Sequence, residues 1–167
     1  AGYACTCIKG RLRAGNFAGS GFAGTLYNLS KLDTASSTAN VVTIDRLYYR
    51  FPVGKEFTFV VGPLMRNTEA LAINPTYYGD IKILNAFTVF GAPGTYNKAT
   101  GGGAGVIWKQ NVKKGNPFFG ASLSYVAGSA FSAATNASCG IMNNNSQSNV
   151  TAQIGYQANQ WKTTLAW

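Results

Sequence analysis

The sequence predicts an all-β chain whose 167 residues supply about eight strands of an antiparallel transmembrane β-barrel. Three observations lead to this fold class. Charged residues make up 11% of the chain, less than half of the roughly 25% usual in soluble domains. Glycine, tyrosine and phenylalanine are abundant, and periodic runs of helix-forming residues are missing. Polar and apolar residues alternate in segments of about nine to eleven residues, the length of a tilted membrane-crossing strand.

Eight such segments follow one another along the chain. The expected strands are residues 7–16, 22–31, 41–51, 55–63, 103–112, 117–126, 149–157 and 160–167. Each has one apolar face and one face of small or polar residues, a pattern that a soluble sandwich would also show. In the barrel interpretation, six apolar side chains of the sixth and seventh segments face lipid: Phe119, Leu123, Tyr125, Val150, Ile154 and Tyr156.

Basic residues gather on one face of the first segment. Lys9, Arg11 and Arg13 alternate with apolar or small residues, and Arg46 and Arg50 repeat the pattern around a tyrosine. Like charges on one strand face repel each other, so this arrangement lowers stability unless something offsets it. A solvated sheet face is one interpretation, and the basic wall of a water-filled lumen is the other. The expected pore-lining residues are Lys9, Arg11, Arg13, Arg46, Tyr48, Arg50 and Lys109.

The stretch from Thr43 to Pro63 predicts a hairpin. A turn at Pro52–Gly54 would pair Phe51 with Lys55 and bring Arg50 opposite Glu56. Asp45 would then share the outward face with Leu47, which is costly within a membrane. We therefore expect Asp45 to lie near a membrane edge or beside a bulge that resets the alternation.

The connections between segments are of two kinds. PVG, VKKGNP and QANQ are short, whereas LDTASSTAN and residues 127–148 are long, as in barrels with short periplasmic turns and longer outer loops. Strand parity would then place Ser20 at the same end as the short turns. This holds if residues 64–102 contain no crossing strand or an even number of them. We expect 64–102 to be an inserted constriction-type loop carrying Glu69 and Asp80; two extra strands are the alternative.

Composition argues against several function classes. The net charge of +9 would suit an anionic partner, but runs of basic residues, zinc-ligand spacing and a P-loop are missing, so nucleic acid is not an expected partner. The sequence has no histidine and only five scattered acids, so we expect neither an enzyme nor a metal or other cofactor.

The residues DRLYYRFPVGKEFTFVVG (Asp45 to Gly62), preceded by RLRAGNF (Arg11 to Phe17) and followed by GAGVIWK (Gly103 to Lys109), resemble the cyanobacterial outer-membrane porins. This family is labelled iron-uptake or carbohydrate-selective. Its members look longer, with an S-layer-like domain and roughly twice as many strands. The resemblance therefore implies that residues 1–167 are part of a larger barrel domain.

The resemblance implies a passive channel in the outer membrane for ions and small hydrophilic solutes, inorganic or sugar. The basic wall adds an expected anion preference, which fits poorly with cationic iron as the permeant. The expected partners are the lipid bilayer and further copies of the chain in a homotrimer. The alternative is a soluble all-β surface or carbohydrate-binding protein that uses Tyr77, Tyr78 and Tyr96 on loops.

Overall fold

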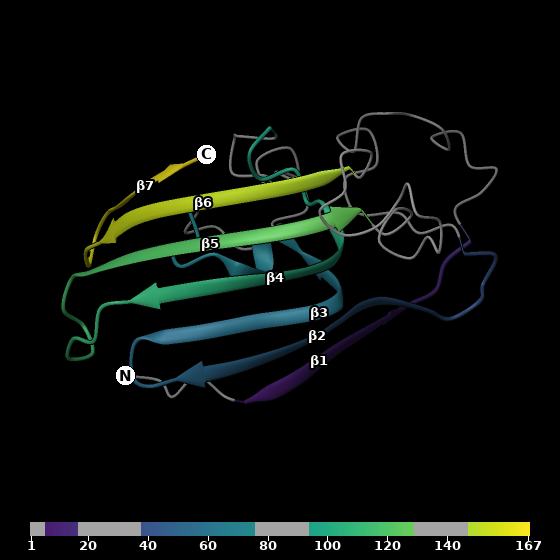
Figure 1. The fold of residues 1–167 in the computed structure, drawn as a ribbon, viewed down its shortest axis with the longest axis horizontal. Coiled ribbons are helices and arrows are strands. Elements are labelled where there is room, and N and C mark those ends of the chain that lie inside the picture. The colour runs from purple at the N-terminus through teal and green to yellow at the C-terminus, as the bar shows by residue number, and fades with distance from the viewer. Residues whose placement is uncertain (1–5, 17–37, 76–93, 129–146) are drawn as a thin grey trace.

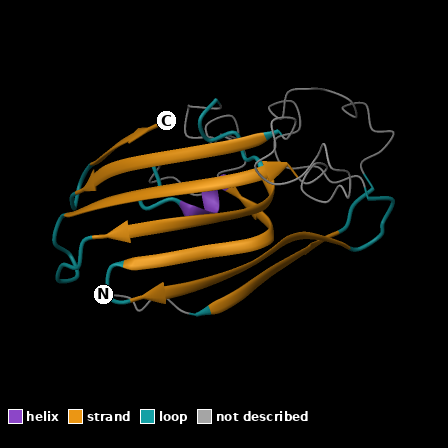
Figure 2. Ribbon diagram, in the orientation of Figure 1, coloured by secondary structure: helices purple, strands orange, loops and turns teal. Residues whose placement is uncertain are grey.

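The computed structural model describes residues 6–16, 38–75, 94–128 and 147–167. They form one antiparallel sheet of seven strands that lie side by side in sequence order (Figure 1). The strands are β1 (Cys7–Arg13), β2 (Thr43–Val53), β3 (Phe57–Arg66), β4 (Thr100–Lys109), β5 (Phe118–Gly128), β6 (Ser148–Gln157) and β7 (Lys162–Ala166). The 3-10 helix η2 (Asn67–Ala70) follows β3 and lies against one face of the sheet (Figure 2).

The all-β antiparallel class is confirmed, but the sheet does not close into a barrel. β1 and β7 are its two edges. The described strands number seven, one fewer than expected, and the expected strand 22–31 lies outside the described residues. β1 pairs directly with β2, so the assumption that a further strand of the meander separates them is wrong.

This pairing also corrects the expected parity of the connections. β2–β3, β4–β5 and β6–β7 are joined at one end of the sheet by short turns, on the left in Figure 1. β1–β2, β3–β4 and β5–β6 are joined at the opposite end. Ser20, which was expected at the short-turn end, lies outside the described residues. Short and long connections alternate without exception along the seven strands.

The β2–β3 turn is shifted from its expected position. β2 continues to Val53, which pairs with Phe57, so the turn is Gly54–Glu56. Gly54 has a φ of 67°, a left-handed conformation that glycine adopts without a steric penalty. Arg50 consequently lies opposite Val60, and the expected pairing of Arg50 with Glu56 is wrong.

The two faces of the sheet have opposite character. We call the first the apolar face, because large hydrophobic side chains of six of the seven strands, all but β4, lie exposed on it. They include Ile8, Leu12, Leu47, Tyr49, Phe57, Phe59, Val61, Phe119, Leu123, Val150, Ile154 and Leu165. Leu123 is 50% exposed and Ile154 is 56% exposed. Nothing in the described part of the chain covers this face.

The opposite face, here called the polar face, is covered. It carries the buried polar side chains Arg46, Thr58, Ser122, Ser124, Thr151 and Gln153. The chain after β3 folds back over this face, and Met65, Ala70, Ala72 and Ile73 form a small core there with Val60, Ile107 and Val126 of the strands. The core therefore lies on the polar side of the sheet, the reverse of a soluble sandwich.

Candidate functional site

Residues 67–75, which we call the covering segment, are held to the polar face by hydrogen bonds to strand side chains. The Ala72 amide donates to Ser122 Oγ over 3.1 Å, and the Ile73 amide donates to Gln153 Oε1 over 3.1 Å. Gln153 Nε2 donates back to the Ile73 carbonyl over 3.0 Å. Strand side chains thus form the hydrogen bonds that the backbone of this segment needs, because the segment is not paired with a strand.

Asn67 and Tyr96 extend this attachment. Asn67 is fully buried, and its Nδ2 lies 2.9 Å from Asn97 Oδ1 and 3.0 Å from Asn149 Oδ1. Tyr96 is 4% exposed, and its hydroxyl accepts a hydrogen bond from Gln153 Nε2 over 3.0 Å. Tyr96 is therefore not an exposed platform for a sugar ring, and the expectation that it binds a ligand on the surface is wrong. Tyr77 and Tyr78 lie outside the described residues.

The covering segment fits the sheet closely at Gly105. A Cβ at this position would lie 2.5 Å from Ala70 Cβ and 3.2 Å from Ser124 Cβ. Gly105→Ala is therefore expected to lower the free energy of unfolding by about 1 to 2 kcal/mol, because the overpacked segment must shift. Adding Ala70→Gly removes the opposing methyl group and is expected to restore part of the loss. Denaturant unfolding of both variants in detergent micelles measures this, and a lack of rescue would contradict the close packing.

Asp45 is the centre of an ion-pair cluster at the long-connection end. The pairing of β1 with β2 shifts register here: Arg11 lies opposite Arg46, and Leu12 lies opposite Ile44. Asp45 is the extra residue, so the bulge alternative is the one that the structure adopts. Its carboxylate forms ion pairs with Arg11, with Arg13 at 3.8 Å and with Arg46 at 3.2 Å.

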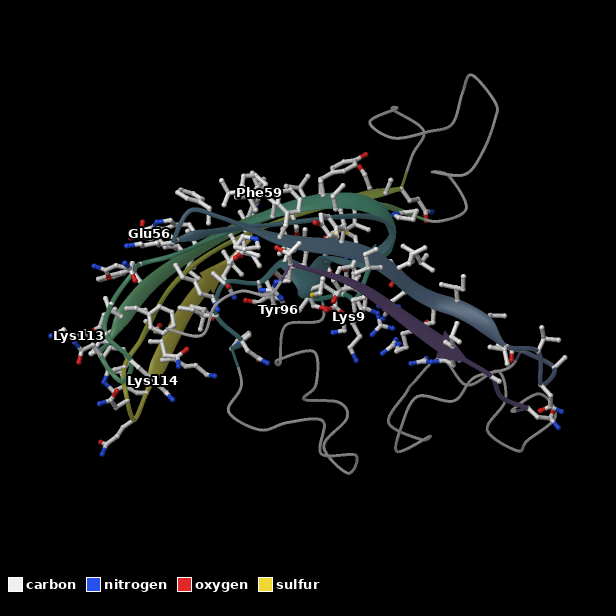
Figure 3. The ribbon with its side chains drawn as sticks, turned by 90° about the horizontal axis from the view of Figure 1, so that it is seen from below. Lys9, Glu56, Phe59, Tyr96, Lys113 and Lys114 are labelled. Atoms are coloured by element: carbon white, nitrogen blue, oxygen red, sulfur yellow. The ribbon has the colours of Figure 1, made fainter. Side chains whose placement is uncertain are left out.

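Glu69 of η2 contacts the same group of basic residues from the covering segment. Its carboxylate accepts a 2.7 Å hydrogen bond from the Tyr48 hydroxyl and lies 3.8 Å from Arg46 Nε and 3.9 Å from Lys9 Nζ. Lys9 also lies over the Tyr48 ring, 5.8 Å from its centroid. Figure 3 shows Lys9 and Tyr96 on one side of the sheet and Phe59 on the other. One acid of the covering segment therefore faces the predicted basic wall.

The structure brings five of the predicted pore-lining residues together and separates two from them. Lys9, Arg11, Arg13, Arg46 and Tyr48 share the cluster around Asp45 and Glu69, whereas Arg50 and Lys109 lie toward the short turns. Asp80 lies outside the described residues.

Sequence reasoning missed Arg66, which interacts electrostatically with Arg11, Arg13, Asp45 and Glu69. β3 was expected to end at residue 63, before Arg66, but a bulge beside Pro63 lets the strand continue. The position of Pro63 in an otherwise regular apolar run is the signal that could have indicated the bulge.

A hollow of about 790 Å³ opens at the short-turn end, next to Arg50 and Lys109. Its other charged lining residues are Lys55, Glu56, Lys113 and Lys114 of the turns. Glu56 accepts hydrogen bonds from Trp108 Nε1 over 2.9 Å and from the Asn111 amide over 3.0 Å. The hydrogen bond from Trp108, and to a smaller extent the one from Asn111, holds the pKa of the Glu56 carboxyl below its ordinary value.

The described residues contain no cluster of three metal-ligating side chains. They also contain no helix that is long and apolar enough to span a membrane. No protein-family model, curated protein or solved structure matches this chain.

Proposed function

We propose that this chain is the wall of an outer-membrane channel of the cyanobacterial porin type. It lets ions and small hydrophilic solutes diffuse passively, with a preference for anions. The observation that carries the proposal is the inverted burial of the sheet. Six of the seven strands expose large hydrophobic side chains on the apolar face, and the polar face is covered. A sheet that turns its apolar side outward is stable only against an apolar environment.

The size of the exposed face argues against a monomer in water. Soluble monomers rarely expose contiguous apolar patches of more than a few hundred Å². The side chains Phe57, Phe59 and Val61 continue across the paired strands to Leu123 and Ile154, without a basic or acidic residue among them. Lipid tails match this surface over the whole sheet.

The lengths of the strands and the arrangement of their connections support the same proposal. Five of the strands are 10 or 11 residues long, which is enough to cross a bilayer at a tilt of roughly 45°. The short connections share one end, and the long connections share the other. An open sheet edge is not tolerated in lipid, so β1 and β7 require further strands, from the same polypeptide or from other copies.

The polar face supplies the proposed lumen, and the covering segment narrows it. Lys9, Arg11, Arg13 and Arg46 meet only Asp45 and Glu69 among the described acids, so the cluster keeps a positive balance that favours anions. A soluble carbohydrate-binding protein is the poorer candidate, because Tyr96 is buried and the exposed aromatic side chains of the described strands lie within the apolar face.

Planar-bilayer recording on the intact protein purified in detergent tests the proposal. We expect discrete conductance steps and reversal potentials that indicate anion preference at low salt, with the preference weakening as salt screens the fixed charges. A protein that stays monomeric in detergent-free buffer and produces no conductance would contradict the channel.

A further inference from the structure

The hollow at the short-turn end has a strongly one-sided charge. Five basic residues line it and one acid does: Arg50 on β2, Lys109 on β4, and Lys55, Lys113, Lys114 and Glu56 on the turns. Figure 3 shows Lys113 and Lys114 at this end of the sheet, away from Lys9. Two hairpin regions of the chain, residues 50–58 and 109–118, therefore place positive charge around the same hollow.

These charges are not neutralised by the described part of the chain. None of the five basic residues forms an ion pair there, whereas Asp45 and Glu69 pair with four basic residues at the other end. Glu56, the one acid in the lining, is held by Trp108 and Asn111. The two ends of the polar face thus differ: the basic residues of one end are partly compensated by acids, and those of the other end are not.

Arg50 and Lys109 are the two basic lining residues that lie on strands and not on turns. Both lie on strands at the rim of the hollow, and Lys109 lies near enough to Arg50 for the two charges to repel each other. Two cations kept together without a counter-ion raise the free energy of the fold, and a bound anion between them would lower it. Gln110, Asn111 and Asn116 add neutral amide groups to the same lining.

We infer that this hollow binds a small, multiply charged oxyanion of the phosphate type. The guanidinium group of Arg50 offers paired N–H donors that match two oxygens of such an anion, and Lys109 adds a compact positive charge. Lys55, Lys113 and Lys114 raise the local concentration of anions around this pair. The role that we infer for this hollow, which is to collect anions at the mouth of the lumen, rests on the proposed function. The binding itself can be measured without a channel.

Isothermal titration of the full-length protein in an uncharged detergent, with inorganic phosphate as the ligand, tests the inference. We expect saturable binding that weakens at least about tenfold in the double variant Arg50→Gln/Lys109→Gln, because both direct charge-assisted contacts are lost. The matched control is Lys98→Gln/Lys162→Gln, which removes two positive charges outside the hollow and is expected to leave the affinity within about twofold.

A second titration with a short-chain phosphatidylglycerol distinguishes a lipid headgroup from the free ion. Binding of inorganic phosphate that depends on Arg50 and Lys109 supports the site with the free anion as its ligand. If only the lipid binds and the double variant abolishes that binding, the phosphate-type site stands with a headgroup as its source. If neither ligand binds, or both double variants weaken binding equally, the inference is overturned. Phosphate binding without bilayer conductance would contradict the proposed channel and leave this site intact.

Discussion

Replacing Leu123 or Ile154 by arginine is expected to lower the free energy of unfolding by about 2 to 4 kcal/mol when the protein is folded in lipid vesicles. Both side chains project from the middle of the apolar face, where they are about half exposed. In water, an arginine at such an exposed position would change stability by no more than roughly 0.5 kcal/mol. In lipid, the charged side chain must leave water, so the cost is several times larger.

Reversible urea unfolding in vesicles, followed by tryptophan fluorescence, measures the effect. Asn159→Arg is the matched control, because Asn159 is exposed in the short β6–β7 turn and an added charge there stays in water. We expect this control to unfold like the unmodified protein. Equal stability of Leu123→Arg, Ile154→Arg and the control would mean that the apolar face meets water and that the membrane proposal is wrong.

Asp45→Asn is expected to destabilise the fold by about 3 kcal/mol, because it leaves a buried arginine with too little negative charge around it. The Arg46 side chain is 2% exposed and lies 3.2 Å from the Asp45 carboxylate. The same carboxylate also pairs with Arg11 and Arg13. Denaturant unfolding of the variant in micelles gives the loss directly.

A double-mutant cycle with Arg46→Met separates the lost ion pairs from other effects of the substitution. Methionine fills a similar space without a charge, so Asp45→Asn/Arg46→Met removes the buried cation together with its partner. We expect the double variant to recover at least about 1 kcal/mol relative to Asp45→Asn alone. Additive losses would show that Arg46 and Asp45 do not act as a pair. Arg13→Gln is the milder comparison, because Arg13 lies 3.8 Å from the carboxylate and is partly exposed.

The sequence by itself determined the strands and their two faces. The period-two alternation in PFFGASLSYVAG and NVTAQIGYQ predicted β5 and β6 almost to the residue, and it predicted which side chains would share the apolar face. This is so because a strand turns successive side chains to opposite faces, so one correct assignment fixes the whole segment. The conflict between Asp45 and its apolar neighbours likewise indicated either a membrane edge or a bulge, and the structure has the bulge.

Tertiary structure alone decided which strands are neighbours and which charges meet. The direct pairing of β1 with β2, the shift of the β2–β3 turn to Gly54–Glu56 and the contact of Glu69 with Arg46 all depend on long-range packing. A residue pattern describes one strand at a time, and it carries no information about a partner many residues away. The partly neutralised basic wall around Asp45 and the unpaired charges at Arg50 and Lys109 could therefore not be told apart in the sequence, where these basic residues alternate with their neighbours in the same way.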